Sequence, residues 1–502
     1  MLLLTRGILL VFFCNFATCM PTTALASSLQ IDPLIDANNT WFEQTLVPLL
    51  PAVRAFSTLR MVPSIPRIIP ETSRHAVLFG GLCGIDRSII GQSFWKTSNP
   101  SYFSDELWIY DFNVMTWRPM YASQSCYSNT SAFATDPTFP LPTPRAAHVA
   151  EFVIAPNGSA VMAVHGGLSS GYNALNDTYF FLFENSNFQS AIALDPSYPS
   201  PPARWGHASI VFNNTMIICG GFGEHGNGLP MDVWRLQWVG GQLLWDRLLS
   251  VRIGTVSVVQ GAPDWPVETS SSSNASHGGK INNNVNGTIV SAPGPRAFFY
   301  FSLKGVGSAI VCGGWANDSS LNQPYSDTWE LLLPGAANYS SHSPQLSNAP
   351  FGDSVTWTLL PVPSPSFAGG HALSITLGDE VYIPVILWGS SSSSKSVFNS
   401  YAYIDEASQP YIFINGSWLS MNLSLRGYEN PSYLVGIPTV YIEDSGLIYM
   451  TGGYSILDGE LTDNSYSVIC IPFQPIFTSA AADTGESQCT SLSLSLYIYI
   501  FH

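Results

Sequence analysis

The sequence predicts an all-β repeat protein, and composition and repetition both lead to this fold class. Only 10% of the 502 residues are charged, whereas 46% are hydrophobic and 13% are aromatic, with 41 Gly and 36 Pro. A chain so poor in Lys, Glu and Arg is not typical of helical bundles or coiled coils. Short hydrophobic runs also end repeatedly in glycine, and aromatic residues follow at nearly constant spacing. Many short strands are therefore expected.

The runs that end in glycine mark the repeat. Five copies end in a glycine pair and a weaker sixth copy ends in one glycine; these glycines are Gly80–Gly81, Gly166–Gly167, Gly220–Gly221, Gly313–Gly314, Gly389 and Gly452–Gly453. Glycine lets the backbone leave a strand in conformations that are closed to residues with a Cβ. Each copy therefore predicts a strand that ends in a sharp turn.

Aromatic residues define the other strands of each repeat. They fall 12, 13, 15, 12 and 13 residues after the last glycine, at Tyr179, Trp234, Trp329, Tyr401 and Tyr466, and 27 residues after Gly81 at Trp108. A further short strand carries Trp117, Trp245, Trp357 or Trp418. Segments with Arg or His precede the glycine runs, as in Arg145 to His148 and Arg204 to His207. The repeat therefore has about four strands.

Four short strands with a glycine pair and an aromatic residue resemble the kelch repeat, whose copies are blades of a β-propeller. The resemblance implies a six-bladed kelch-type β-propeller over residues 27–475, most similar to the attractin/muskelin type, with a low-complexity insertion at about 266–294 and a C-terminal tail at 476–502. The last copy has no fourth strand with Trp. We therefore expect an N-terminal strand, residues 40–47, to complete the last blade and close the ring, which removes two sheet edges.

The N-terminal segment is typical of a secretory signal peptide, predicted at residues 1–26. Arg6 precedes an apolar run that is shorter than the roughly 18 residues of a membrane-spanning helix, and Ala24 and Ala26 resemble a cleavage site. No other apolar run is long enough, so no membrane span is expected in the mature chain. The protein is expected to be secreted, or at the cell surface if a C-terminal anchor is missing from this sequence.

Eleven Asn-x-Ser/Thr sequons support an extracellular route. The candidate glycosylation sites are Asn38, Asn129, Asn157, Asn176, Asn213, Asn274, Asn286, Asn317, Asn338, Asn415 and Asn422. Surface glycans would also explain how so weakly charged a chain stays in solution. The net charge of −16 argues against nucleic acid as a partner, because phosphate binding needs clustered Lys and Arg.

Long insertions are expected on one face of the propeller, where the second strands end. They cover about residues 82–104, 119–143 and 250–294. Binding usually occurs on such loops. The candidate binding-face residues are Phe94, Trp95, Tyr102, Phe103, Tyr121, Tyr127, Tyr172, Phe222, His225, Trp315 and Tyr454. Aromatic side chains of this kind suit a protein or glycan ligand. The alternative is that many of them pack the loops onto the blades.

Six cysteines follow the predicted signal peptide; four of them form two groups, and Cys470 and Cys489 are not assigned. Cys83 and Cys126 lie in loops of the same face, so a disulfide between them is expected in an oxidising compartment. Cys219 and Cys312 occupy the same place in neighbouring repeats, where the distance is too great for a bond, so buried free thiols are expected.

No catalytic, cofactor-binding or metal-binding residue is predicted. His148, His207 and His371 are interpreted as one repeat position and hence as structural residues. The motifs of zinc proteases, serine hydrolases and nucleotide-binding loops are absent from the sequence. The favoured function is a non-catalytic binding module in an extracellular glycoprotein. The alternatives are an extracellular propeller enzyme, similar to a copper-radical oxidase or acting on glycans, and the ectodomain fragment of a longer membrane protein.

Overall fold

The computed structural model describes residues 50–63, 74–84, 99–121, 142–184, 187–251, 292–316, 324–334, 354–377, 381–391, 410–420, 434–442, 447–455, 460–462 and 465–469. All of them belong to the second of two compact units, Leu49–His502. The predicted signal peptide, the predicted ring-closing strand and the C-terminal tail lie outside the described residues, as does nearly all of the low-complexity insertion.

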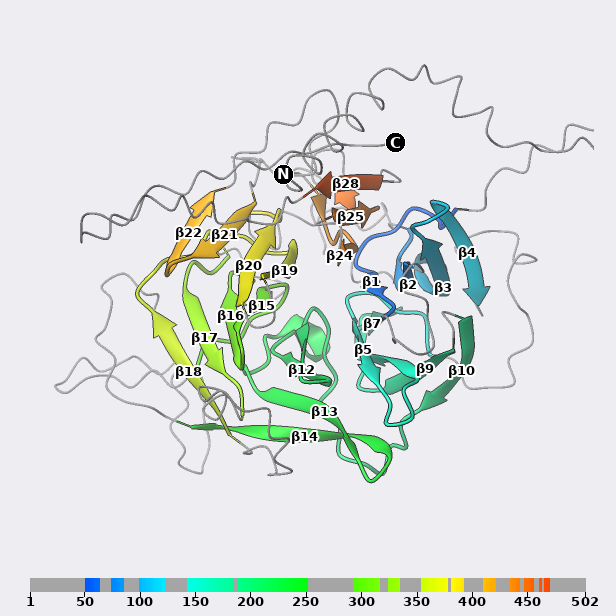
Figure 1. Ribbon diagram of the computed structural model, residues 1–502, viewed down its shortest axis with the longest axis horizontal. Coiled ribbons are helices and arrows are strands. Elements are labelled where there is room, and N and C mark those ends of the chain that lie inside the picture. Colours follow the sequence, from blue (N-terminus) through cyan, green and yellow to red (C-terminus); the bar gives the residue numbers. More distant parts are fainter. Residues whose placement is uncertain are drawn as a thin grey trace, which may run out of the picture. The chain divides into compact units, whose positions relative to one another are not determined.

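Within this unit the chain forms an all-β, β-propeller-like fold, as the composition predicted (Figure 1). Its described residues contain two single turns of 3-10 helix, η3 (Pro100–Tyr102) and η5 (Glu224–Gly226), and no α-helix. Among these residues no helix is long and apolar enough to cross a membrane. The fold is therefore built from strand pairing and from packing between sheets.

Along the chain the strands follow one another in six groups of antiparallel neighbours, which we call sets 1 to 6. Sets 1 and 2 consist of β1 (Thr58–Met61), β2 (His75–Leu82), β3 (Phe103–Asp111), β4 (Thr116–Tyr121), and of β5 (Val149–Ile154), β6 (Ala160–His165), β9 (Thr178–Glu184), β10 (Asn187–Ala193). Sets 3 and 4 consist of β11 (Ala208–Phe212), β12 (Thr215–Cys219), β13 (Val233–Val239), β14 (Gln242–Val251), and of β15 (Tyr300–Gly305), β16 (Ser308–Cys312), β17 (Thr328–Leu332), β18 (Ser354–Leu360).

Sets 5 and 6 complete the series. They consist of β19 (His371–Leu377), β20 (Val381–Leu387), β21 (Tyr411–Ile414), β22 (Ser417–Ser420), and of β24 (Thr439–Ile442), β25 (Leu447–Thr451), β28 (Ser465–Ile469). Sets 3, 4 and 5 are joined into one 12-stranded sheet by a parallel pairing of β14 with β18 and by a pairing of β15 with β20. Short pairings form between loops: β7 (Leu168–Ser169) with β8 (Asn173–Ala174), and β26 (Tyr454–Ser455) with β23 (Leu434–Val435) and β27 (Glu460–Leu461). The first strand of each set lies nearest the centre of the unit (Figure 1).

The hydrophobic core lies between neighbouring sets, because alternate side chains of a strand point to opposite faces of its sheet. On β6, Met162 packs with Phe79 of set 1, whereas Val161 packs with Met216 of set 3. The last set packs against the first in the same way: Tyr449 stacks on Tyr110, with ring centroids 4.8 Å apart and planes at 10°. Each sheet is therefore covered on both faces.

A closed cycle of six backbone hydrogen bonds connects the sets at their inner ends. Each bond runs from the amide of one residue to the carbonyl of its counterpart in the neighbouring set, over 2.7–2.9 Å; in order the residues are Phe56, Gly436, Gly369, Phe298, Gly206 and Ala147, whose amide donates to Phe56. All six have a positive φ, between 52° and 77°. This conformation is sterically unfavourable for Phe and Ala. The surrounding structure must therefore hold Phe56, Ala147 and Phe298 in place.

The glycine pairs adopt the turn that the sequence predicted. In all five pairs both glycines have a positive φ, from 63° to 116°. The weak sixth copy differs, because Trp388 replaces the first glycine and still adopts a φ of 47°.

Set 5 also differs in its third strand. The spacing predicted an aromatic strand at Tyr401, which lies outside the described residues, but the strand that pairs with β20 is β21, with Ile412 opposite Val385. The chain between Gly389 and β21 is longer than the corresponding segments of sets 2, 3, 4 and 6, so counting 12 to 15 residues from Gly389 stops short of the strand. Tyr411 and Phe413 supply the aromatic residues that the repeat requires.

Candidate functional site

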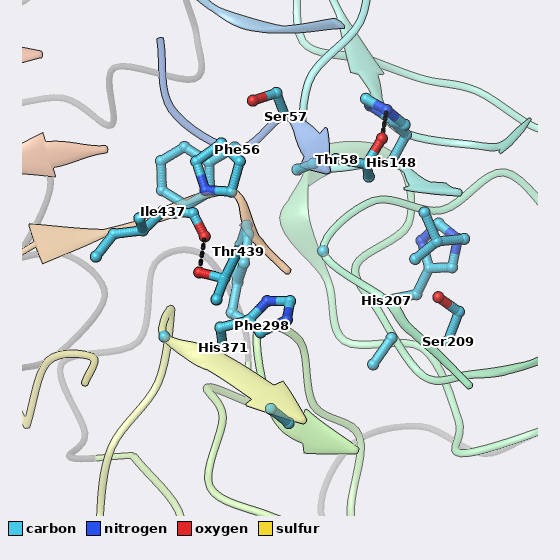
Figure 2. Close-up of a pocket in the computed structure, with 18 of the residues that line it drawn as sticks. Phe56, Ser57, Thr58, His148, His207, Ser209, Phe298, His371, Ile437 and Thr439 are labelled. Atoms are coloured by element: carbon cyan, nitrogen blue, oxygen red, sulfur yellow. Dashed lines mark hydrogen bonds between the residues drawn. The ribbon is translucent and has the colours of Figure 1, made fainter. Parts of the chain in front are cut away.

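The first strands of all six sets surround two connected hollows, which we call the axial channel. The inner hollow has a volume of about 150 Å³ and the outer one about 360 Å³, and both are lined by Arg60, Ser209, His371 and Thr439. Figure 2 shows the inner hollow, with His148, His207 and Ser209 on one side and His371 and Thr439 on the other. Polar side chains from sets that are far apart in the sequence therefore converge here.

One end of the channel is closed by an apolar cluster. Trp205, Phe222 and Trp315 are at most 1% exposed, and their rings surround the edge of Phe298, with centroids 5.8, 6.1 and 5.9 Å from it. Phe56 contacts Phe298 from the other side at 5.5 Å. Phe222 and Trp315 follow glycine pairs, and Phe56 and Phe298 belong to the hydrogen-bonded cycle. Trp205 directly precedes the cycle residue Gly206, so the turns at the inner ends of the sets also fill this end of the channel.

An ion pair crosses the channel wall. Arg60 on β1 donates through Nε and Nη2 to the two carboxylate oxygens of Glu151 on β5, each over 3.0 Å. Ser209 on β11 donates its hydroxyl to the same carboxylate over 2.7 Å. Sets 1, 2 and 3 are thus connected by one charge-compensated group, and a paired Arg–carboxylate contact of this geometry is among the stronger hydrogen bonds in proteins.

His148 and His207 lie between neighbouring sets. The His148 ring lies against Gly80 and the His207 ring against Gly166, where a Cβ would be 2.8 and 3.0 Å away. Thr58 Oγ1 is 3.0 Å from Nε2 of His148, the bond drawn in Figure 2. Burial, reinforced by Arg145, lowers the pKa of His148 well below its ordinary value, and burial with His165 and Arg204 does the same for His207. Both rings are therefore neutral.

His371 does not occupy the same repeat position, contrary to the sequence interpretation. The hydrogen-bonded cycle aligns Gly369 with Ala147 and Gly206, so the counterpart of His148 and His207 is Gly370. A one-residue shift moves a side chain to the other face of a strand, and His371 lines both hollows of the channel. Burial, followed by the charge of Arg60, lowers its pKa to about 3.

Four fully buried arginines stabilise the glycine turns of the fold. The sequence analysis did not single them out as a group. Arg145, Arg204 and Arg296 each form a two-bond contact with an aspartate, over 2.6–3.1 Å, and also donate to the carbonyl of a first glycine. Arg54 donates to the Gly80 carbonyl in the same way, but it forms a single hydrogen bond, through Nη2, with Glu106. The tryptophans Trp108, Trp234 and Trp329 donate to these acids. The signal was present in four of the six repeats, as an Arg before the glycine run and an acid two residues before the aromatic residue of the third strand.

The predicted binding-face residues separate into three groups. Phe94, Trp95 and Tyr127 lie outside the described residues. Phe103, Tyr121, Phe222, Trp315 and Tyr454 are at most 4% exposed and pack in the core, as the alternative interpretation stated. Tyr102 and Tyr172 are half-buried and His225 is exposed. Among the candidates that the structure describes, the last group alone presents side-chain surface on these loops.

The structure describes four of the eleven sequons and three of the cysteines. Asn157, Asn176, Asn213 and Asn415 are exposed, and the other seven candidate sites lie outside the described residues. Cys219 and Cys312 are buried free thiols, as predicted. Cys83 is disulfide-bonded; Cys126 lies outside the described residues, so a bond between these two stays a prediction.

Among the described residues, no three His, Cys, Asp or Glu side chains come together in a way that could hold a metal ion. No protein-family model and no curated protein match the chain. A solved structure of YjhT is similar to it, with 13% identity and a TM-score of 0.42 over 84% of this chain and 97% of the other.

Proposed function

We propose that the chain is a secreted or cell-surface glycoprotein whose six-bladed kelch-type propeller is a non-catalytic binding module for a protein or glycan. In this proposal the six strand sets are the blades, and residues 40–47 complete the last one next to β28. The hydrogen-bonded cycle and the packing of Tyr110 on Tyr449 support six blades in a closed ring. Deleting residues 40–47 should then prevent stable folding, whereas deleting residues 476–502 should not.

One observation carries the binding role. Tyr172 and His225, on loops that follow the glycine turns of neighbouring sets, have φ values of 62° and 65°. A side chain in this conformation costs about 1–3 kcal/mol, and such strain persists where the surrounding structure holds a residue in place, often at ligand sites. The Tyr172 ring also rests on buried Trp205, 5.8 Å between centroids. A rigid scaffold therefore presents preorganised side chains on this face.

The polar groups of the channel favour binding over catalysis. The carboxylate that lines it in the described part of the chain, Glu151, is engaged by Arg60 and Ser209, and its histidines are held neutral by burial. Glycan hydrolysis in the usual mechanism needs two opposed carboxylates.

The test uses protein secreted from a eukaryotic host. A loss of mass on enzymatic deglycosylation, which decreases in an Asn157→Gln variant, supports an extracellular glycoprotein. Glycan-array and cell-surface binding are then compared for the wild type, a Tyr172→Ala/His225→Ala variant and a control with Asn214→Ala on the turn between β11 and β12. Binding that is lost in the loop variant and kept in the control supports the proposal. Stoichiometric copper with oxidase activity would overturn it in favour of the enzyme alternative.

A further inference from the structure

The turn between β3 and β4 carries the two most exposed large hydrophobic side chains that the structure describes. Val114 is 62% exposed and Met115 is 77% exposed. Single hydrophobic residues on a protein surface are common and need no explanation. An adjacent pair at the end of a turn is different, because it presents a small continuous apolar surface to solvent. We call Val114 and Met115 the apolar tip.

Met115 also adopts an unfavourable backbone conformation, with a φ of 53°. Glycine and asparagine are the residues that tolerate this left-handed region best. The corresponding turns of sets 3 and 5 follow this preference, since they consist of Gly240–Gly241 and Asn415–Gly416, all with a positive φ. Set 1 therefore places a hydrophobic residue where the same turn in these two sets uses glycine or asparagine.

The fold itself does not account for Met115. The other described non-glycine residues with a positive φ are asparagines, members of the backbone cycle, Trp388, and the loop residues Tyr172 and His225. The members of the cycle are held by hydrogen bonds and Trp388 by core packing, whereas the Met115 side chain is largely exposed. Strained backbone conformations persist mainly at functional sites, so the apolar tip is a candidate for such a site.

Contacts at the base of the turn hold the apolar tip in place. The amide of Phe112 donates to the Arg74 carbonyl over 2.9 Å, and the Phe112 ring packs edge-on against Tyr449, with centroids 5.5 Å apart. The amide of Asn113 donates to Oδ1 of Asp111 over 2.8 Å. Because the turn is already ordered, little conformational entropy is lost when its side chains enter a binding site, which favours binding.

The size of the apolar tip indicates which kind of partner it fits. Two side chains bury far less than the roughly 800 Å² that each partner contributes to a standard protein interface, so two copies meeting tip to tip would not form a stable dimer. A membrane is also a poor match, because the Gly–Gly and Asn–Gly turns at the same end of sets 3 and 5 add no apolar side chain, and the net charge of −16 is repelled by anionic lipids. A small apolar pocket fits instead, since a few buried anchor residues carry most of the energy of an interface.

We propose that Val114 and Met115 are anchor residues that insert into an apolar pocket of a protein partner. The flexible thioether side chain of Met115 suits such a pocket, because it adapts to the shape of its walls. The apolar tip lies at the opposite end of the strands from Tyr172 and His225, because the strands of each set alternate in direction. The proposal therefore does not depend on the function proposed for those loops, and two partners can bind at the same time.

Stability measurements separate a binding role from a packing role. Met115→Asn introduces a residue that tolerates a positive φ, so the denaturation midpoint should stay the same or rise. Val114→Ser changes an exposed side chain and should leave the midpoint unchanged. Phe112→Ser removes a ring from the base of the turn and should lower it, which provides the control. A fall in the midpoint for the Val114→Ser/Met115→Asn variant as large as that for Phe112→Ser would overturn the proposal.

Photo-crosslinking then identifies the partner. The full secreted chain carries a diazirine amino acid in place of Val114 or, as the control, in place of Val239, which is 49% exposed at the corresponding end of β13. Both proteins are applied to the cells that produce the chain. A protein that crosslinks from position 114 and not from position 239 is purified, and its affinity for each variant is measured by calorimetry.

The purified partner should bind the wild type at least about tenfold more tightly than the Val114→Ser/Met115→Asn variant. The Val239→Ser control and the Tyr172→Ala/His225→Ala variant should bind it as the wild type does, which keeps this proposal separate from the role of the loops. The proposal is overturned if no protein crosslinks from position 114, or if the crosslinked protein binds the tip variant as tightly as the wild type.

Two further measurements test the other possible occupants. Phosphatidylcholine vesicles, with and without phosphatidylserine, should not sediment with the wild type. Analytical ultracentrifugation should give the same oligomeric state for the wild type and the Val114→Ser/Met115→Asn variant. Vesicle binding that this variant loses would assign the apolar tip to a lipid surface, and an oligomer that it loses would assign the tip to a second copy of the chain. Either result overturns the proposal.

Discussion

Strand sets 3 and 5 form the same turn with different residues. In set 3, Arg204 is buried against Asp232 and donates to Gly220, and His207 packs into the neighbouring set at Gly166. In set 5, Phe367 stands at the position of the arginine, Trp388 at that of the first glycine, and Gly370 at that of the histidine.

Both sets still take part in the backbone cycle. The amide of Phe298 donates to Gly206 of set 3, and the amide of Gly369 in set 5 donates to Phe298. At Gly370 a Cβ would be 2.1 Å from the backbone carbonyl of Trp388, so the histidine of set 3 could not be placed here. The backbone geometry is thus the shared feature, and the buried polar groups are one of two ways to support it.

The largest difference should appear when the arginine is removed. Arg204→Met leaves Asp232 without its charged partner and should lower the free energy of unfolding by about 3–5 kcal/mol. Phe367→Leu, at the same place in set 5, should lower the free energy of unfolding by about 1 kcal/mol. The cost is smaller because Phe367 forms no ion pair, so its substitution leaves no buried charge without a partner. Chemical denaturation followed by tryptophan fluorescence measures both. Equal losses would mean that the ion pair contributes little to set 3.

Substituting the first glycine should have the next largest effect. Gly220 has a φ of 64°, and a Cβ there would be 2.7 Å from Met231 Sδ and 2.9 Å from the Arg296 carbonyl. Gly220→Ala should therefore cost about 2–4 kcal/mol.

Gly240 provides the matched control, because its φ is 59° and no atom lies within 4 Å of the added Cβ. Gly240→Ala should cost only the backbone strain, about 1 kcal/mol. The same denaturation experiment compares the two variants. A cost at Gly240 as large as that at Gly220 would show that steric contact is not the main cause of the loss in stability.

Acid should destabilise the protein through its buried histidines. Burial lowers the pKa values of His148 and His207 in the folded state, so below about pH 6.5 only the unfolded chain takes up their protons. The free energy of unfolding should then fall by about 1.4 kcal/mol per pH unit for each histidine. His371 adds to this fall down to about pH 3.

The variant His207→Phe removes one of these groups. Its free energy of unfolding should depend less steeply on pH, by about 1.4 kcal/mol per unit, when denaturation midpoints are measured between neutral pH and the acid limit. An unchanged slope would show that His207 is protonated in the folded protein as well.

The smallest effect is expected at Cys219, whose place in set 5 is taken by Leu387. Burial raises the pKa values of Cys219 and Cys312, and both are 0% exposed. Iodoacetamide should therefore not label either thiol until the protein unfolds, as peptide mass mapping can show. Cys219→Val should cost less than about 1.5 kcal/mol. Rapid labelling of the native protein would contradict the burial.

Much of the fold could be predicted because the repeat is marked by residue types that occur in few structural contexts, such as glycine in sharp turns. The glycine pairs predicted the turns, and Trp108, Trp234 and Trp329 predicted the third strands of their sets. The prediction failed where a role was taken by an atypical residue. Trp388 in a left-handed conformation and the long connection before β21 moved the third strand of set 5 beyond its expected place.

The candidate site was harder to predict, because it depends on which face of a strand a residue occupies. His371 was grouped with His148 and His207, yet a shift of one residue places it in the channel. Arg60 and Glu151 belong to no repeated motif and meet only because β1 and β5 are neighbours at the centre. The burial of Phe222 and Trp315 depends on packing between loops, which spacing along the sequence does not reveal.

The hydrogen-bonded cycle has a consequence for how this unit can lose structure. In a linear repeat array, an end repeat can unfold while the rest remains intact, since each repeat contacts only its neighbours. Here every residue of the cycle uses its amide toward one neighbour and its carbonyl toward the other. Breaking any one of the six hydrogen bonds leaves one amide donor and one carbonyl acceptor without a partner. Among the sets that the structure describes, none is a terminal repeat in this sense, so removal of one set should behave as global unfolding.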